Sequence, residues 1–275
     1  MVAELATEAE VLALLPFPDD CAVRRMHNEG VLLLGGGRAL LLQIAHPAVA
    51  AGVANHSNYH TERWRRLLRT LRPMHEIVFG TREQALVAVQ GINRIHKRVS
   101  GPGYDARDPA LLLWVLATLI DTSLVMRERF VGPLPPAEAE AYYADMCRLG
   151  LLLDVPADYL PADLAAFRAY FDKTLASLQV SGAGRGIARE LLKLTPTSWP
   201  AIAPLRLFTA GLLPEPLRDQ FGLGWGPKRQ ATLRAIEAFS RIVVPRLPRR
   251  LRRPPWFLMP SRPLNAAGRT LKNRV

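Results

Sequence analysis

Six histidines give this chain its clearest capacity to bind a metal, and four of them lie within one short stretch. They are His27, His46, His56, His60, His75 and His96. No HExxH motif is present, and no cysteine lies near His56 and His60, which are spaced i, i+4. Because structural zinc sites take four ligands from cysteine, histidine and carboxylate side chains, the sequence argues against such a site.

His96 stands out because it shares one helical face with apolar residues. Helical spacing places it in a stripe with Ala85, Val89, Ile92 and Val99. An inward-facing imidazole needs a hydrogen-bond partner or a metal, because burying it unsatisfied costs free energy. Two interpretations stay open on this pattern. His96 is either a core histidine bonded to a backbone carbonyl, which is the commoner case, or an axial ligand of haem iron.

The helix expected before that one, over residues 62–78, carries polar side chains that share one side. Arg66 and Arg69 are spaced i, i+3, and Arg66 and Thr70 are spaced i, i+4. A solvated basic face is the default interpretation of such an arginine-rich helix. The alternative is a polar patch over a cofactor plane, where arginine pairs with carboxylates and threonine hydrogen-bonds to an oxygen species.

Three consecutive glycines, Gly35, Gly36 and Gly37, precede Arg38 and resemble the start of a phosphate-binding loop. Neither GxGxxG nor GxxxxGK[ST] is present, and no strand of a βαβ unit precedes the glycines. We therefore expect the glycines to let a buried helix start close to a neighbouring element.

The elements that must position these residues are helices. Strand patterns are poor, whereas a capping-box-like start at Thr81 and an Asp108-Pro109 start predict well-defined helices. Pro47 should kink or restart the helix that begins after the glycines. The helices expected are 38–46, 62–78, 81–99, 110–130, 137–149 and about 161–178. The sequence thus predicts an all-α fold, with one helical domain over residues 1–250 and a basic, Pro/Arg-rich tail over 251–275.

Composition and charge indicate the cellular compartment in which the protein is expected to work. The two cysteines, Cys21 and Cys147, form no disulfide framework and predict a reducing, cytoplasmic compartment. The acidic N-terminal segment lacks the basic region of a secretory signal. No apolar run reaches the roughly 18–20 residues of a spanning helix, so each is expected to be a buried core helix.

The net charge of +12 is concentrated after Lys228, in arginine-rich sequence that also holds Trp256 and Phe257. The simplest interpretation is a solvated basic tail. The alternative is peripheral contact with an anionic membrane. We expect no nucleic-acid partner, because the basic residues lack interleaved aromatic side chains suited to base stacking and no binding motif is present.

Several motifs, taken in order, resemble one known family. The run LLLGGGRALLLQIAHPAVAAGVANHS over residues 32–57 resembles the signature of the bacterial MpaB-like oxygenases. That family shares a catalytic domain with the rubber oxygenase called latex clearing protein. The supporting motifs are RLLRT (66–70), IVFG (77–80), RIHKRVSG (94–101) and YDARDPALLLWV (104–115). The resemblance covers roughly residues 25–160 and extends more faintly to about 250.

The resemblance implies a globin-like helical core, a haem b cofactor and O₂-dependent oxidation of a small apolar substrate such as an alkene or isoprenoid. By matching motifs, His96 is the predicted iron ligand, and Arg66 and Thr70 are the predicted catalytic residues on the distal side. Arg69, Arg38 and His46 are predicted to contact the cofactor, with His46 as the reserve ligand. The alternative function is a non-catalytic helical protein that binds haem, lipid or another apolar ligand at a membrane surface.

Two positions depart from the family pattern. Arg69 stands where the latex clearing branch has a lysine that can cap the iron, and a guanidinium cannot lose its proton to do so. Leu116 stands where many MpaB-like sequences have a histidine between TrpVal and AlaThr. If that histidine takes part in the chemistry of the relatives, this chain is altered there. If His96 is the ligand, the change is tolerated.

Overall fold

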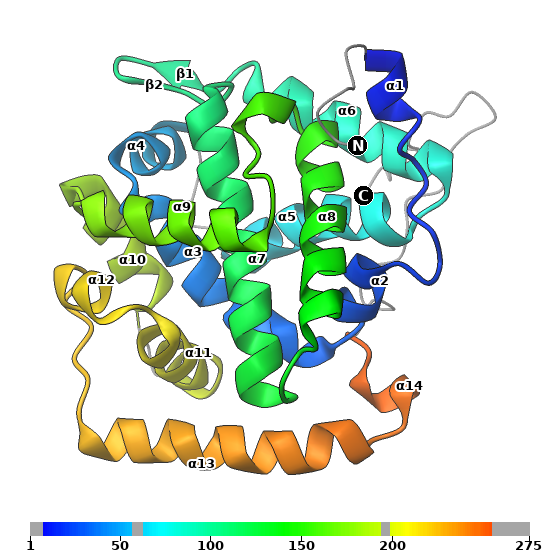
Figure 1. Cartoon of the computed structure of the whole chain (residues 1–275). Coiled ribbons are helices and arrows are strands. Elements are labelled where there is room, and N and C mark those ends of the chain that lie inside the picture. The colour runs from blue at the N-terminus through cyan, green and yellow to red at the C-terminus, as the bar shows by residue number, and fades with distance from the viewer. Residues whose placement is uncertain (1–7, 57–62, 194–198, 255–275) are drawn as a thin grey trace, which may run out of the picture.

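The computed structural model describes residues 8–56, 63–193 and 199–254, and leaves out the side chains of residues 8, 63–70 and 199–201. This part of the chain is almost entirely helical, which confirms the prediction of an all-α single domain (Figure 1). The first elements are α1 (Glu8–Leu12), α2 (Ala22–His27), the 3₁₀ helix η2 (Gly30–Gly35), α3 (Gly36–Ala45), α4 (Pro47–His56), α5 (Arg63–Phe79) and α6 (Arg82–His96).

A two-stranded hairpin of β1 (Ser100–Gly101) and β2 (Tyr104–Asp105) follows, and it is the one sheet among the described residues. The helices after it are α7 (Pro109–Phe130), α8 (Pro136–Leu152), η3 (Ala157–Tyr159), α9 (Leu164–Ser177), α10 (Gly182–Leu191), α11 (Trp199–Leu212), α12 (Glu215–Gln220), α13 (Pro227–Val243), η4 (Val244–Arg246) and α14 (Arg249–Arg252).

Helix α7 runs through the middle of the molecule, with α3, α8, α9 and α13 packed around it (Figure 1). It starts as predicted, since the Asp108 side chain accepts a hydrogen bond from the Ala110 amide and Pro109 occupies the first turn. In its first half, Trp114 donates a hydrogen bond of 3.1 Å to the Leu42 carbonyl of α3 and stacks on Phe171 of α9. These contacts make α7 the element that organises the core.

By length and composition, α7 meets the criterion for a membrane-spanning helix, and the bent pair of Gly30–Ala45 with Pro47–His56 meets it jointly. The apolar window of α7 has a mean hydropathy of 1.8, and 61% of it is buried inside the fold. Asp121, in the middle of the helix, is hydrogen-bonded to Arg38. The expectation that no apolar stretch is long enough to span is therefore wrong for α7, whereas the burial of most of its apolar window agrees with the expected core helix.

The start of α3 is closely packed, which confirms the predicted role of the glycines. A Cβ atom at Gly37 would lie 2.0 Å from the Thr209 hydroxyl of α11, and one at Gly35 would lie 2.7 Å from Met126 of α7. Nothing lies within 4 Å of a Cβ at Gly36. At the other end, Pro47 restarts the helix after a bend of 106°.

Helices α5 and α6 form an antiparallel hairpin and pack extensively on each other. The Thr81 side chain accepts a hydrogen bond from the Gln84 amide, and the Gln84 side chain caps the Thr81 amide, so the predicted capping box is present. The predicted end at Val99 is wrong, because α6 ends at His96. The Val99 carbonyl instead accepts a hydrogen bond from Ala106, which closes the β1–β2 hairpin.

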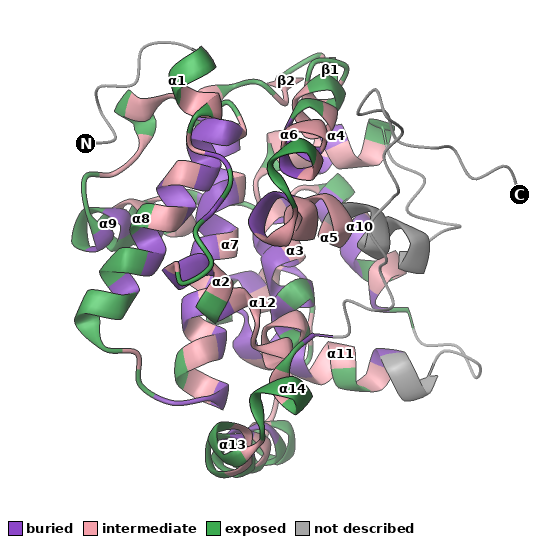
Figure 2. Ribbon diagram, turned by 90° about the vertical axis from the view of Figure 1, so that its right-hand side faces the viewer, coloured by how far each residue is buried: buried purple, intermediate pink, exposed green. Residues whose placement is uncertain are grey.

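Helices α13 and α14 lie at one end of the molecule, away from β1 and β2 (Figures 1 and 2). A small apolar cluster joins α13 to the end of α7 and to α11, and it contains Met126, Phe130, Phe208, Leu212 and Leu233. One side of α13 is therefore part of the core, while most of its other residues are exposed (Figure 2).

Candidate functional site

His96 is the last residue of α6 and lies where the apolar face of that helix reaches the surface. Ala85 and Val89 are fully buried, whereas Ile92 and His96, further along the same stripe, are half-buried. Burial lowers the pKa of the His96 imidazole, and the nearby carboxylate of Asp154 opposes that shift. The ring is therefore neutral near pH 7 and keeps a lone pair that can bind a metal.

Asp154, beside His96, was not singled out in the sequence. It follows the end of α8 and adopts a left-handed backbone conformation with φ of 64°. A non-glycine residue in this conformation is uncommon and is most often Asn or Asp. A carboxylate close to a histidine can orient the ring and raise its basicity, so Asp154 is a candidate partner for His96.

His46 lies at the bend between α3 and α4 and is also half-buried. Its Nδ1 atom is buried and has no hydrogen-bond partner among the described residues. Burial lowers the pKa of this imidazole too, against a smaller opposing effect of Asp108. A buried imidazole nitrogen without a partner is costly to the fold, so this position is available for a ligand.

The segments that follow His46 and His96 pack against each other. A Cβ atom at Gly52 of α4 would lie 3.5 Å from the Val99 side chain and 3.5 Å from the Tyr104 ring. The Tyr104 hydroxyl accepts a hydrogen bond of 3.0 Å from Asn55 and lies 3.1 Å from Nε2 of His56. The fold therefore brings α4, the end of α6 and the β1–β2 hairpin together.

Arg66, Arg69 and Thr70 lie in α5, but their side chains are outside the described residues. The backbone still indicates how far along the α5–α6 hairpin these residues lie. Arg66 precedes Gly80 by fourteen residues, and His96 follows Thr81 by fifteen. Because α5 and α6 are joined by two residues and rise equally per residue, we infer from the count of residues that Arg66 and His96 lie at a similar level along the hairpin.

Arg38 is buried and bonded to the protein. Its guanidinium donates hydrogen bonds to the Leu212 carbonyl (2.8 Å), the Thr122 hydroxyl (2.7 Å) and the Asp121 carboxylate (2.6 Å). These contacts join the start of α3 to α7 and α11. The structure thus separates Arg38 and His46, which lie at opposite ends of α3.

Leu116 occupies a packing position between α7 and α8. Its side chain is buried, and a Cβ atom at Gly150 of α8 would lie 2.6 Å from its Cδ2 atom. The position for which the resemblance predicts a histidine is therefore filled here by an apolar side chain in the core.

The remaining histidines have other surroundings. His27 is half-buried, with Nε2 3.2 Å from the Tyr142 hydroxyl, and burial lowers its pKa to about 4. His75 stacks on Phe79 within α5 at a ring separation of 5.0 Å. His60 lies outside the described residues. Within the described ranges, no group of three or more His, Cys, Asp or Glu side chains could hold a metal ion.

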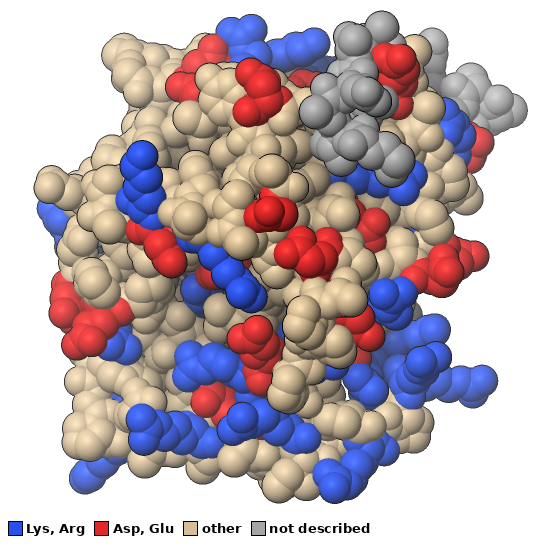
Figure 3. Space-filling view, viewed as in Figure 1, with Lys and Arg blue, Asp and Glu red and all other residues tan. Residues whose placement is uncertain are grey.

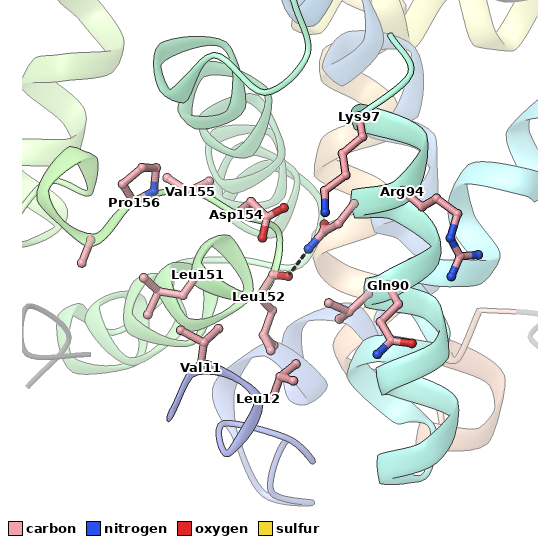
Figure 4. A pocket seen from close by; sticks show the side chains of 13 residues that line it. Val11, Leu12, Gln90, Arg94, Lys97, Leu151, Leu152, Asp154, Val155 and Pro156 are labelled. Carbon is pink, nitrogen blue, oxygen red and sulfur yellow. Dashed lines mark hydrogen bonds between the residues drawn. The ribbon is translucent and has the colours of Figure 1, made fainter. Parts of the chain in front are cut away.

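A cavity of about 720 Å³ lies between α6, the end of α8 and α1 (Figure 4). Its polar side is formed by Gln90, Asn93 and Arg94 of α6 and by Lys97, which follows that helix, and Asp154 projects toward α6 from the opposite side. Asn93 donates a hydrogen bond of 3.1 Å to the Leu152 carbonyl, which ties the two helices together. The cavity lies close to His96, because Lys97 is the next residue in the chain and Asp154 is near the His96 ring. Its polar lining is poorly suited to binding an apolar molecule.

Comparison with known proteins places most of the chain in one family. Residues 23–242 match the family described as ER-bound oxygenase mpaB/B'/Rubber oxygenase, catalytic domain. An uncharacterized protein of Mycobacterium tuberculosis, Rv2237, is 30% identical over 224 residues, which cover 77% of this chain and 88% of the relative. The uncharacterized protein Mb2261 of Mycobacterium bovis matches to the same extent. No solved structure matched the chain.

Proposed function

Because the chain belongs to the MpaB and rubber oxygenase catalytic-domain family, we propose that it is a haem b-dependent oxygenase that uses O₂ to oxidise an apolar substrate. The observation that carries the haem proposal is the buried Nδ1 atom of His46, which has no partner among the described residues. A second half-buried imidazole, His96, ends α6, and the segment after it packs against α4 at Gly52. The fold thus offers two histidines that can meet a cofactor.

The chemistry of these side chains fits a haem. Both imidazoles have pKa values lowered by burial, so both are neutral near pH 7 and can donate a lone pair. Each also lies near a carboxylate, Asp108 for His46 and Asp154 for His96, that can raise the basicity of the ring. We keep His96 as the proposed iron ligand and His46 as the proposed cofactor contact and reserve ligand.

The other predicted residues take distinct roles. When bound, haem supplies the activation of O₂, and the protein sets its ligand, polarity and access. Arg66, level with His96 on the adjacent helix, would donate hydrogen bonds to the oxygen reactant together with Thr70. Arg69 would supply a fixed positive charge to cofactor carboxylates. Arg38, with three protein acceptors, would act by holding α3 in place rather than by touching the cofactor.

Absorption spectroscopy of the purified protein reconstituted with haem tests the cofactor. We expect a Soret band that His96→Ala abolishes or shifts strongly. His56→Ala is the matched control, because that histidine is exposed and bonded to Tyr104. Loss of the band in His46→Ala, with a normal band in His96→Ala, would move the ligand to His46. A protein that takes up no haem would contradict the proposal.

Oxygen consumption with an isoprenoid hydrocarbon tests the reaction separately. In protein that holds haem normally, Arg66→Met and Thr70→Val should lower the rate by roughly 100-fold, because each removes a hydrogen-bond donor to developing charge. Haem binding without any oxygen consumption in the unaltered protein would favour the alternative of a non-catalytic haem protein.

A further inference from the structure

We propose that the outer side of α13, η4 and α14 docks on the surface of an anionic lipid bilayer. This outer side, the basic face, is defined by the exposed residues of 227–254. Its exposed cations are Lys228, Arg229, Arg234, Arg241, Arg246, Arg249, Arg250 and Arg253. Figure 3 shows Lys and Arg side chains along this lower edge of the molecule. Glu237, the one carboxylate of the segment, points inward and pairs with Arg129.

The inner side of this segment is fixed to the body of the protein. Leu233 is fully buried, and the Ser240 hydroxyl donates a hydrogen bond of 2.7 Å to the Phe130 carbonyl at the end of α7. Arg252 of α14 pairs with Glu29, and a Cβ atom at Gly30 would lie 2.9 Å from the Arg252 carbonyl. The contacts of the inner side therefore fix the orientation of the basic face. The outward side chains take no part in these contacts.

Large apolar side chains are exposed on the same face. Phe239, Ile242 and Leu251 are 67%, 58% and 70% exposed, and they make up half of the exposed large hydrophobic residues in the described part of the chain. At about 100° per residue, Ile242 lies about 180° around α13 from the buried Leu233. Ile242 thus points away from the core, and the large exposed fractions of Phe239 and Leu251 place them at the surface as well.

Alanines and arginines complete the pattern around α13. Ala231, Ala235 and Ala238 are exposed and share the outward side with Ile242. Arg234 and Arg241 border this apolar stripe on one side, and Arg229 borders it on the other. An apolar stripe bordered by cations is the arrangement of helices that lie in the plane of a membrane interface. There, arginine meets the anionic headgroups while Phe and Ile enter the acyl boundary.

A bilayer suits this face better than other occupants. A second copy of the chain would bring two strongly basic faces together, in a protein whose net charge is +12. Nucleic acid would neutralise the arginines but would give Ile242 and Leu251 no apolar surroundings. The sequence after Pro254 continues in the same character, with Trp256, Phe257 and four further cations before the end and no acidic residue.

Co-sedimentation with lipid vesicles tests the proposal, and it requires no haem. The full chain should bind vesicles of phosphatidylcholine with about one third phosphatidylglycerol, bind phosphatidylcholine alone much more weakly, and dissociate as salt rises. Arg241→Glu with Arg249→Glu should weaken binding by at least about 30-fold, since each cation near the surface is worth about 1 kcal/mol. Arg168→Glu with Arg189→Glu, on α9 and α10, changes the net charge equally and should weaken binding far less.

A matched pair of isoleucines tests the apolar part. Ile242→Ser should lower the partition coefficient by roughly tenfold, whereas Ile95→Ser should leave it unchanged. The two side chains are similarly exposed, at 58% and 61%, but Ile95 lies on α6, outside the basic face. Thermal unfolding followed by circular dichroism checks that each variant is folded.

Three results would overturn the proposal. The first is a full chain that does not bind anionic vesicles. The second is an equal loss of binding in the control variants. The third is binding to duplex DNA, or formation of a dimer, that the basic-face variants abolish while vesicle binding is absent. That last result would assign the face to nucleic acid or to a second copy.

Discussion

The two ends of α3 differ in how their buried polar groups are satisfied. At the first end, Arg38 reaches a carbonyl, a hydroxyl and a carboxylate, and the neighbouring Gly37 allows α11 to approach closely. At the second end, His46 has a buried nitrogen with no partner among the described residues. A satisfied polar network stabilises one arrangement of the fold, whereas an unsatisfied group costs about 1–3 kcal/mol. The comparison indicates that the first end serves the architecture and the second end is open to a ligand.

The largest effect should come from breaking the Arg38 network. Arg38→Met removes the partner of Asp121, whose side chain is 21% exposed, and also two further hydrogen bonds. We expect the free energy of unfolding of the cofactor-free protein to fall by about 3–5 kcal/mol, measured by urea denaturation. Arg107→Met, which removes an exposed ion pair with Asp105, is the control and should leave the midpoint almost unchanged. A loss no larger than the control's would contradict the architectural role.

Substitutions at Gly36 and Gly37 test the close packing at the first end of α3, and their expected effects on stability are smaller. Gly37→Ala would place a methyl group against Thr209 and should destabilise the protein by about 1–3 kcal/mol. Gly36→Ala, one residue earlier, meets no atom within 4 Å and should stabilise by about 0.4–1 kcal/mol. Thermal melts of the two variants side by side provide the measurement. An equal loss of stability in both variants would contradict the close-approach explanation, because alanine has the higher helix propensity at both positions.

The smallest expected effect is a loss of folding stability as the pH is lowered, and it concerns His46 at the second end of α3. Burial lowers the pKa of His46 in the folded protein, so its neutral form contributes stability that is present above the unfolded pKa of about 6.5. That stability is lost as the pH falls through 6.5 toward the lower folded value. In the cofactor-free protein, His46→Leu should reduce the slope of unfolding free energy against pH in this window. Arg38→Met should not change it, because arginine does not titrate there. Equal slopes in His46→Leu and the unaltered protein would contradict this prediction.

Local features were predictable because they depend on adjacent residues. The capping box at Thr81, the Asp108-Pro109 start and the restart at Pro47 all follow from side chains within four positions of the backbone groups they affect. The predicted start of a helix near Pro161 was wrong, because α9 begins at Leu164, where Asp163 accepts a hydrogen bond from the Ala166 amide. An aspartate before an apolar helix was a signal available in the sequence.

Long-range pairings were not predictable from these patterns. Arg38 was expected to contact a cofactor, yet its observed partners Asp121 and Thr122 lie more than eighty residues away in the chain. The spacing of residues in the sequence does not predict contacts between α3 and α7, because these helices meet only through tertiary packing. For the same reason, neither the proximity of Asp154 to His96 nor the missing partner of His46 has a signature in the sequence.

The α5–α6 hairpin has a consequence for how the family can vary in length. Gly80 and Thr81 alone connect the two helices, and a Cβ atom at Gly80 would lie 2.4 Å from the Glu76 carbonyl. The register between Arg66 and His96 is therefore determined within one hairpin and not by the rest of the domain. Insertions elsewhere in the chain leave that register intact. A single residue added within either helix between these positions would turn one of them by about 100° relative to the other. Relatives that share this arrangement should accordingly keep this interval constant in length while their other connections grow or shrink.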